Sequence, residues 1–183
     1  MLDEIGLERT AISVIPTLDQ HPLSEDPADR QRSVEYLNGL VDCAAALGAQ
    51  GIGGPLHQTL GHFSGAGTTE AEFDRAREVH TKVGDHAQAN GQVIALEAVN
   101  RFESYFANTM DDLCAYTQSL NHPAIKTMYD TFHANLEERD PVAAYTRNAG
   151  DVVHIHISEN DRGVPGSGHV PWAETFGAIK SSG

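Results

Sequence analysis

The chain has 183 residues, 40% of them hydrophobic and 21% charged, and a formal net charge of -14. This length and composition exclude a disordered chain and fit one domain spanning residues 1–183. The acidic excess would repel a phosphate backbone, which excludes nucleic acid as a partner. No apolar run approaches the roughly 20 residues of a membrane span, and the first residues form no leader pattern. We therefore expect a cytoplasmic protein with no membrane partner.

Short apolar runs alternate with longer amphipathic segments along the chain. Five of the short runs are apolar on both faces and bounded by turn residues, which predicts buried strands. These strands are Ala11–Ile15, Gln50–Gly53, Val93–Val99, Ile125–Asp130 and Val152–Ser158.

The amphipathic segments predict helices with recognisable ends. The first has Asp26 as its N-cap and Pro27 in its first turn, and it ends at Gly48. The second begins with a capping box formed by Thr69 and Glu72. Three further helices are expected near residues 109–120, after residue 141 and after residue 171.

Three of the five predicted strands end in a residue that can bind a metal ion. Glu97 is a carboxylate in an apolar run, so it must be paired, protonated or metal-bound. Asp130 ends the next strand, and His154 and His156 share one face of the last. Taken singly, each has a structural explanation: an ion pair, a helix cap or a hydrogen bond to a carbonyl. Two carboxylates and one imidazole converging from three strand ends instead predict a site for Mn²⁺, Co²⁺ or Mg²⁺.

Alternation of strands and helices predicts a parallel α/β sheet with right-handed crossovers. Ligands at the carboxyl ends of several strands favour a (β/α)8 TIM barrel over a doubly wound sheet. A whole barrel has eight units and about 250 residues, and this sequence supplies about five units. We therefore expect an incomplete barrel that lacks the first strands and the last strand.

Several segments around the predicted ligands carry a family resemblance. They are Gly53–Leu56, Leu96–Glu103, Asp130–His133, His154–His156 with Glu159 and Arg162, and Val164–Gly168 with Pro171 and Trp172. In residues and in spacing they resemble the ketose 3-epimerases, namely the D-tagatose, D-allulose (psicose) and L-ribulose 3-epimerases of the xylose-isomerase-like barrel superfamily.

The resemblance implies that Glu97 is both a metal ligand and a catalytic acid/base, and that Asp130 and His156 are further ligands. Mn²⁺ is the favoured metal. The reaction implied is epimerisation of a ketose at C3 through an enediolate, whose charge the metal would stabilise. The sugar-binding residues implied are Glu103, His133 and Arg162.

The sequence departs from the family's pattern at two places. His57 would border the substrate end of the cleft, where the family often has an aromatic residue. The family also uses a second glutamate, on the last barrel strand, as the fourth ligand and the opposing acid. Because this sequence ends before that strand, we expect impaired activity in the isolated chain. The full-length family implies a homo-oligomer.

Other functions remain open at this stage. The same superfamily includes aldose-ketose isomerases, hydroxypyruvate-type isomerases and inosose-type dehydratases, although Glu103 and Arg162 favour the epimerase. Its abasic-site endonucleases fit neither the negative charge nor the small ligand set. A non-catalytic alternative is a partial barrel that depends on association, because exposed strand edges invite pairing. The sequence leaves open which sugar is used and whether it is phosphorylated.

Overall fold

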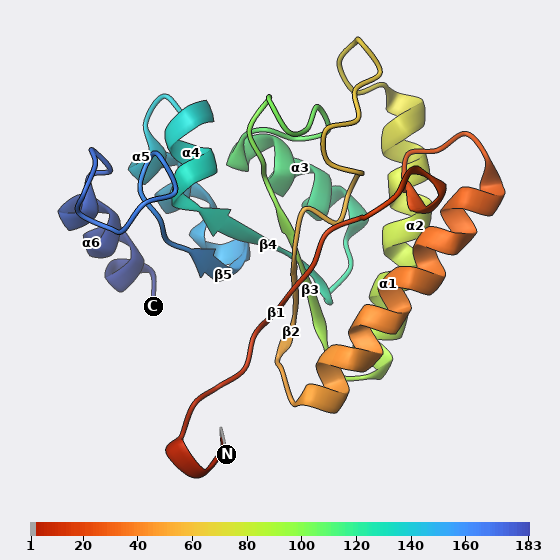
Figure 1. Ribbon diagram of the computed structural model, residues 1–183, viewed down its shortest axis with the longest axis horizontal. Coiled ribbons are helices and arrows are strands. Elements are labelled where there is room, and N and C mark those ends of the chain that lie inside the picture. The colour runs from red at the N-terminus through yellow and green to blue at the C-terminus, as the bar shows by residue number, and fades with distance from the viewer. Residues whose placement is uncertain (1–2) are drawn as a thin grey trace.

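The computed structural model describes residues 3–183 and contains a five-stranded sheet (Figure 1). All neighbouring strands are parallel, and their spatial order follows the chain order. The sheet is open, with β1 and β5 at its two edges, so the prediction of an α/β partial TIM barrel is confirmed. The strands are β1 (Ala11–Ile12), β2 (Gly51–Gly54), β3 (Val93–Glu97), β4 (Ile125–Asp130) and β5 (Val152–His156).

The five predicted helices are present, together with one that was not predicted. The unpredicted helix is α4 (Thr131–Glu137), which starts directly after β4 with no intervening turn. The predicted helices are α1 (Pro27–Leu47), α2 (Glu70–Ala89), α3 (Met110–Leu120), α5 (Pro141–Asn148) and α6 (Trp172–Ser182). Single 3₁₀ turns occupy Asp3–Ile5, Leu18–Gln20 and Ala149–Asp151.

The predicted helix ends are confirmed in atomic detail. Asp26 Oδ1 accepts a hydrogen bond of 2.8 Å from the N–H of Ala28, and Gly48 ends α1 in a left-handed conformation with φ of 70°. Thr69 and Glu72 form a reciprocal capping box at the start of α2. Caps of this kind typically contribute about 1 kcal/mol each to stability.

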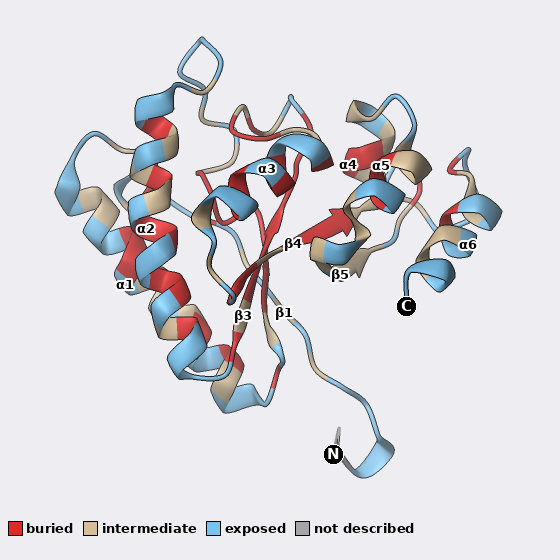
Figure 2. Cartoon of the chain, turned by 180° about the vertical axis from the view of Figure 1, so that it is seen from behind, coloured by how far each residue is buried: buried red, intermediate tan, exposed pale blue. Residues whose placement is uncertain are grey.

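The core lies between the sheet and the helices that cover its outer face. Figure 2 shows buried residues in α1, α2 and β3. One buried cluster includes Leu37 and Val41 of α1, Val79 and Val83 of α2 and Ile94 of β3. Burying a side chain of this size contributes roughly 1.5–3 kcal/mol relative to leaving it exposed. This core therefore fixes β3, the strand that ends in Glu97.

Several predicted details were wrong. β1 has two residues because only its first part pairs with β2, although Ile15 makes an isolated bridge to Thr59. β5 ends at His156 and is a half-buried edge strand, with Val153 53% exposed, whereas a buried strand was expected. β3 ends at Glu97, two residues before the predicted end. Within residues 3–183, no helix is both long and apolar enough to cross a membrane.

Candidate metal and sugar site

Three side chains meet at the carboxyl ends of neighbouring strands. Glu97 ends β3, Asp130 ends β4 and His156 ends β5, and Asp130 is paired with His156 in the sheet register. His156 Nδ1 lies 3.6 Å from Glu97 Oε1 and 3.5 Å from Asp130 Oδ2. One ligand atom from each of the three lies within 4.8 Å of the others. The cluster is thus formed by adjacent strand ends, as the sequence predicted.

The geometry of this cluster fits a divalent cation. Atoms bound to one ion at about 2.0–2.2 Å lie roughly 3–4 Å apart, and the two distances from His156 Nδ1 fall in this range. Hydrogen bonds to Asp130 and Glu97 raise the pKa of His156 to about 9, and the negative charges of the two carboxylates add to this shift. Metal binding would displace the imidazolium proton. Two carboxylate oxygens and one imidazole nitrogen suit Mn²⁺, Co²⁺ or Mg²⁺.

The two oxygens of Asp130 have different partners. Oδ1 accepts hydrogen bonds from the N–H groups of Phe132, at 2.7 Å, and His133, at 3.1 Å, and so caps α4. Oδ2 is the oxygen near His156. Burial raises the pKa of Asp130, but the hydrogen bonds from His156, His133 and Phe132 outweigh burial and lower it. The carboxylate is therefore ionised and oriented before any ligand binds.

His133, predicted to bind substrate, lies beside the cluster and is held in one tautomer. Its Nδ1 accepts a hydrogen bond of 3.0 Å from the backbone N–H of Asn100, so Nε2 carries the ring proton. Nε2 lies 3.9 Å from Glu97 Oε1. Asn100 was not among the predicted site residues, but it is buried and its Nδ2 lies 2.9 Å from both His133 Nδ1 and Glu103 Oε1. Asn100 therefore links two predicted sugar-binding residues.

Arg162 and Glu103, the other predicted sugar-binding residues, form an ion pair. Arg162 Nη2 lies 2.6 Å from Glu103 Oε1, and Arg162 Cζ lies 4.1 Å from the centre of the Phe132 ring. Burial raises the pKa of Glu103, but hydrogen bonds from Asn100 and Arg162 lower it to a larger extent. Glu103, His133 and Arg162 are thus joined through Asn100 and Phe132 into one network next to the candidate metal ligands.

The prediction that His57 borders the cleft was wrong, because its side chain is completely buried. His57 Nε2–H donates a hydrogen bond of 2.8 Å to the backbone carbonyl of Glu97, and the ring stacks on Phe106. Burial lowers the pKa of His57 to about 3, so the ring is neutral. His57 therefore holds the backbone of Glu97, a candidate metal ligand, in place.

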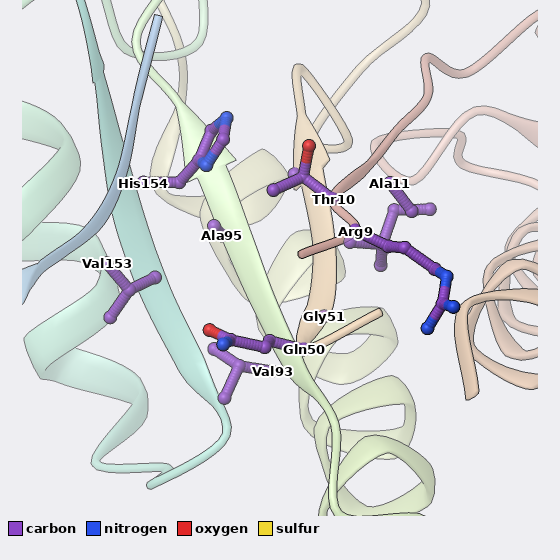
Figure 3. A pocket seen from close by; sticks show the side chains of 11 residues that line it. Arg9, Thr10, Ala11, Gln50, Gly51, Val93, Ala95, Val153 and His154 are labelled. Carbon is purple, nitrogen blue, oxygen red and sulfur yellow. The ribbon is translucent and has the colours of Figure 1, made fainter. Parts of the chain in front are cut away.

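A cavity of about 240 Å³ lies elsewhere, on the inner face of the sheet (Figure 3). It is lined by residues at the amino ends of the strands, such as Thr10, Gln50 and Val93, and by His154. In a closed barrel this interior is filled by side chains. None of the three candidate metal ligands lines it, so the cavity and the candidate site are separate features.

Comparison with known proteins identifies the family. The family model described as the xylose isomerase-like TIM barrel matches residues 1–183. The chain belongs to this family.

Xylose isomerase-like TIM barrel proteins similar to this chain include sugar epimerases. The chain is 32% identical over 170 residues to the D-psicose 3-epimerase of Ruminiclostridium cellulolyticum, and the match covers 92% of this chain and 58% of that protein. The chain is also 34% identical over 181 residues to the L-ribulose 3-epimerase of Mesorhizobium japonicum, and the match covers 98% of this chain and 60% of that protein. The resemblance to ketose 3-epimerases is thus confirmed, and the chain spans about 60% of the length of these relatives.

Solved structures agree with this assignment. The chain superimposes on an L-ribulose 3-epimerase with a TM-score of 0.93 and 31% identity, covering 99% of this chain and 60% of the other. It superimposes on a D-psicose 3-epimerase with D-tagatose from Clostridium cellulolyticum H10 with a TM-score of 0.91 and 29% identity, covering 98% and 62%.

Proposed function

We propose that this chain carries the metal-binding and proton-abstracting part of a ketose 3-epimerase site. The observation that supports this most directly is the cluster of Glu97, Asp130 and His156 at three adjacent strand ends. The relatives that are 32% and 34% identical to this chain are named D-psicose 3-epimerase and L-ribulose 3-epimerase. A free ketose is the proposed substrate class.

The chemistry of the cluster explains how such a reaction would start. A C–H bond next to a ketone is a weak acid. Glu97, Asp130 and His156 would hold the metal, with Mn²⁺ proposed, and a bound metal would supply a Lewis acid that stabilises negative charge developing on the ketose oxygens. Glu97, which is 5% exposed, is the proposed base that takes the proton from C3, because proton transfer needs a carboxylate within reach of the carbon.

The neighbouring network would orient the sugar. His133 presents Nε2–H as a donor, and the guanidinium of Arg162 supplies further donors. Glu103, an acceptor, is already aligned by Asn100. A polyhydroxylated ketone offers carbonyl and hydroxyl groups, which could accept hydrogen bonds from His133 and Arg162 and donate one to Glu103.

The cluster contains one proposed base. A single carboxylate that removes a proton and returns it to the same face exchanges hydrogen with solvent without inverting the carbon. We therefore propose that the isolated chain catalyses exchange at C3 more readily than net epimerisation.

The test is solvent exchange at carbon. The purified chain, with Mn²⁺ and D-fructose or D-allulose in D₂O, is expected to introduce deuterium at C3, detected by NMR of the recovered sugar. Glu97→Gln should lower the rate at least about 100-fold, since general-base catalysis typically contributes 10²–10⁴-fold. Glu174→Gln, an equivalent change at an exposed glutamate, should leave the rate unchanged.

Other results would contradict the proposal. Deuterium at C1 would indicate an aldose-ketose isomerase with the same metal site. An equal rate in Glu97→Gln would remove Glu97 as the base. No exchange by a chain that is folded by circular dichroism and binds Mn²⁺ would show that this chain does not abstract the proton.

A further inference from the structure

The segment between β5 and α6 is organised around one buried carboxylate. Glu159 has no exposed surface. Its Oε1 accepts hydrogen bonds from the N–H of Gly166, at 2.7 Å, and from the indole N–H of Trp172, at 2.5 Å. Its Oε2 accepts from the N–H groups of Val170, at 3.1 Å, and Asn160, at 3.3 Å. One side chain therefore ties together residues 160, 166, 170 and 172.

The backbone of Glu159 also fixes the turn that carries Arg162. Its carbonyl accepts a hydrogen bond of 2.9 Å from the N–H of Arg162, and its N–H donates to the carbonyl of Gly163 at 3.1 Å. Arg162 has a φ of 61°, a left-handed conformation that a residue with a side chain adopts only when its surroundings require it. The conformation of Arg162 thus depends on the contacts of Glu159.

The partners of Glu159 require a carboxylate. Each of the four is an N–H donor. A glutamine at this position would direct an amide NH₂ group toward donors and leave them unsatisfied. Burial raises the pKa of Glu159, but the hydrogen bonds from Trp172, Val170 and Gly166 outweigh burial and lower the pKa to about 2.

The packing around the carboxylate leaves no space for a larger neighbour. A Cβ atom added to Gly168 would lie 2.6 Å from Glu159 Oε2 and would overlap Asn160 Oδ1. Trp172, which donates to Glu159, also stacks on Phe176 in α6. The loop is therefore clamped to the first turn of α6 at the same point.

The contacts of Arg162 itself are too weak to set this arrangement. The side chain of Arg162 is 55% exposed in its ion pair with Glu103. Ion pairs exposed to this degree contribute little to stability because solvent screens them, and a cation–π contact at an exposed site is similarly weak. The position of the arginine must therefore come mainly from the loop that carries it.

We propose that Glu159 is a positioning residue that holds Arg162 against Glu103 and Phe132 at the sugar end of the site. The consequence for sugar binding rests on the function proposed above, whereas the effect on the loop does not. Glu159 acts through the loop, since its hydrogen bonds go to residues between 160 and 172.

The first measurement is backbone hydrogen exchange in Glu159→Gln. The N–H groups of Arg162, Gly166 and Val170 should exchange roughly tenfold faster or more, because their acceptors are lost or displaced. Exchange in α1 and α2 should not change. Trp172 is the one tryptophan of the sequence, so a single indole N–H resonance, recorded without metal, should shift when its acceptor is replaced.

The second measurement separates positioning from a general loss of structure. By calorimetry, Glu159→Gln should weaken D-allulose binding to the Mn²⁺-loaded chain roughly tenfold and change the Mn²⁺ affinity less than about twofold, because the metal ligands lie on the strands. Glu174→Gln, at an exposed position of α6, is the matched control. If Glu159→Gln does not fold, Trp172→Phe removes only one donor and should give a smaller change of the same kind.

The outcomes distinguish this inference from the proposed function. Unchanged exchange of the loop N–H groups in a folded variant, Glu159→Gln or Trp172→Phe, would overturn the inference. Equal loss of Mn²⁺ and sugar affinity would also overturn it, since the residue would then support the whole molecule. Faster loop exchange in a chain whose wild type binds Mn²⁺ but no ketose would support the positioning of Arg162 and contradict the proposed function.

Discussion

Asp130 is the residue at which fold and chemistry are most closely combined, since one oxygen caps α4 and the other faces His156. Asp130→Asn keeps a good N-cap but removes the negative charge from the cluster. We expect Mn²⁺ affinity to fall at least roughly tenfold, or about 1.4 kcal/mol, with little change in stability. Calorimetric titration with Mn²⁺ at fixed pH measures this.

The control for Asp130→Asn is Asp85→Asn, because the side chain of Asp85 is 73% exposed and belongs to α2 rather than to a strand end. It should bind Mn²⁺ as the wild type does. Equal affinities of wild type and Asp130→Asn would exclude Asp130 as a ligand.

The sequence could predict the ligand cluster but not the residues that orient it. Glu97, Asp130 and His156 each end an apolar run, so parallel pairing alone brings them together. Asn100 follows β3 in a loop, and only the folded structure shows that its N–H fixes the tautomer of His133. His57 was misassigned because its place at the cleft was inferred from the family resemblance alone, whereas its contact with Phe106 is a tertiary feature that the sequence does not show.

At the level of elements, the capping box of α2 should contribute measurably to stability. Thr69 Oγ1 accepts from the N–H of Glu72 at 3.3 Å and donates to its carboxylate at 2.8 Å. Thr69→Ala removes both contacts and should lower the free energy of unfolding by about 1 kcal/mol. Urea unfolding followed by circular dichroism measures the change.

A second substitution in α2 tests whether the effect belongs to the cap. Thr81 lies exposed within the helix, so Thr81→Ala should be neutral or slightly stabilising because alanine has the higher helix propensity. Equal destabilisation by the two substitutions would contradict the role of the capping box.

Elements with local signals were predictable, and those set by tertiary contacts were not. Asp26, Pro27 and Gly48 specify α1 through neighbours in sequence. α4 was missed because Asp130 ends a strand and caps a helix at the same time, leaving no loop as a signal. The half-buried state of β5 depends on its place at the edge of the sheet, which apolar composition alone does not reveal.

For the whole molecule, three buried histidines make stability depend on pH. His21, His57 and His80 are at most 5% exposed. Burial is the main cause of their lowered pKa values, about 4 for His21, about 3 for His57 and about 4 for His80. An unfolded histidine titrates near 6.5. Between pH 6.5 and about 4, the unfolded chain therefore binds protons at these positions and the folded chain does not.

The sign of this effect is that stability falls as pH falls below 6.5, because protons favour the state that binds them. His156, whose pKa is raised to about 9, has the opposite effect, and its contribution lies above this range. From pH 7 to pH 5, each of the three lowered histidines should remove about 2 kcal/mol, up to about 6 kcal/mol in all. That loss is comparable with the whole stability of many domains, roughly 5–15 kcal/mol.

Urea unfolding at pH 7, 6 and 5, with a chelator present, measures this dependence. His80 is a useful probe because its ring nitrogens contact Tyr116 Oη, at 2.5 Å, and the carbonyl of Leu56, at 3.2 Å, both inside the core. His80→Gln removes one titrating group, so it should reduce the pH dependence by about one third whatever it does to stability at pH 7. A free energy of unfolding that stays constant from pH 7 to pH 5 would contradict this prediction, because the folded and unfolded chains would then bind the same number of protons over this range.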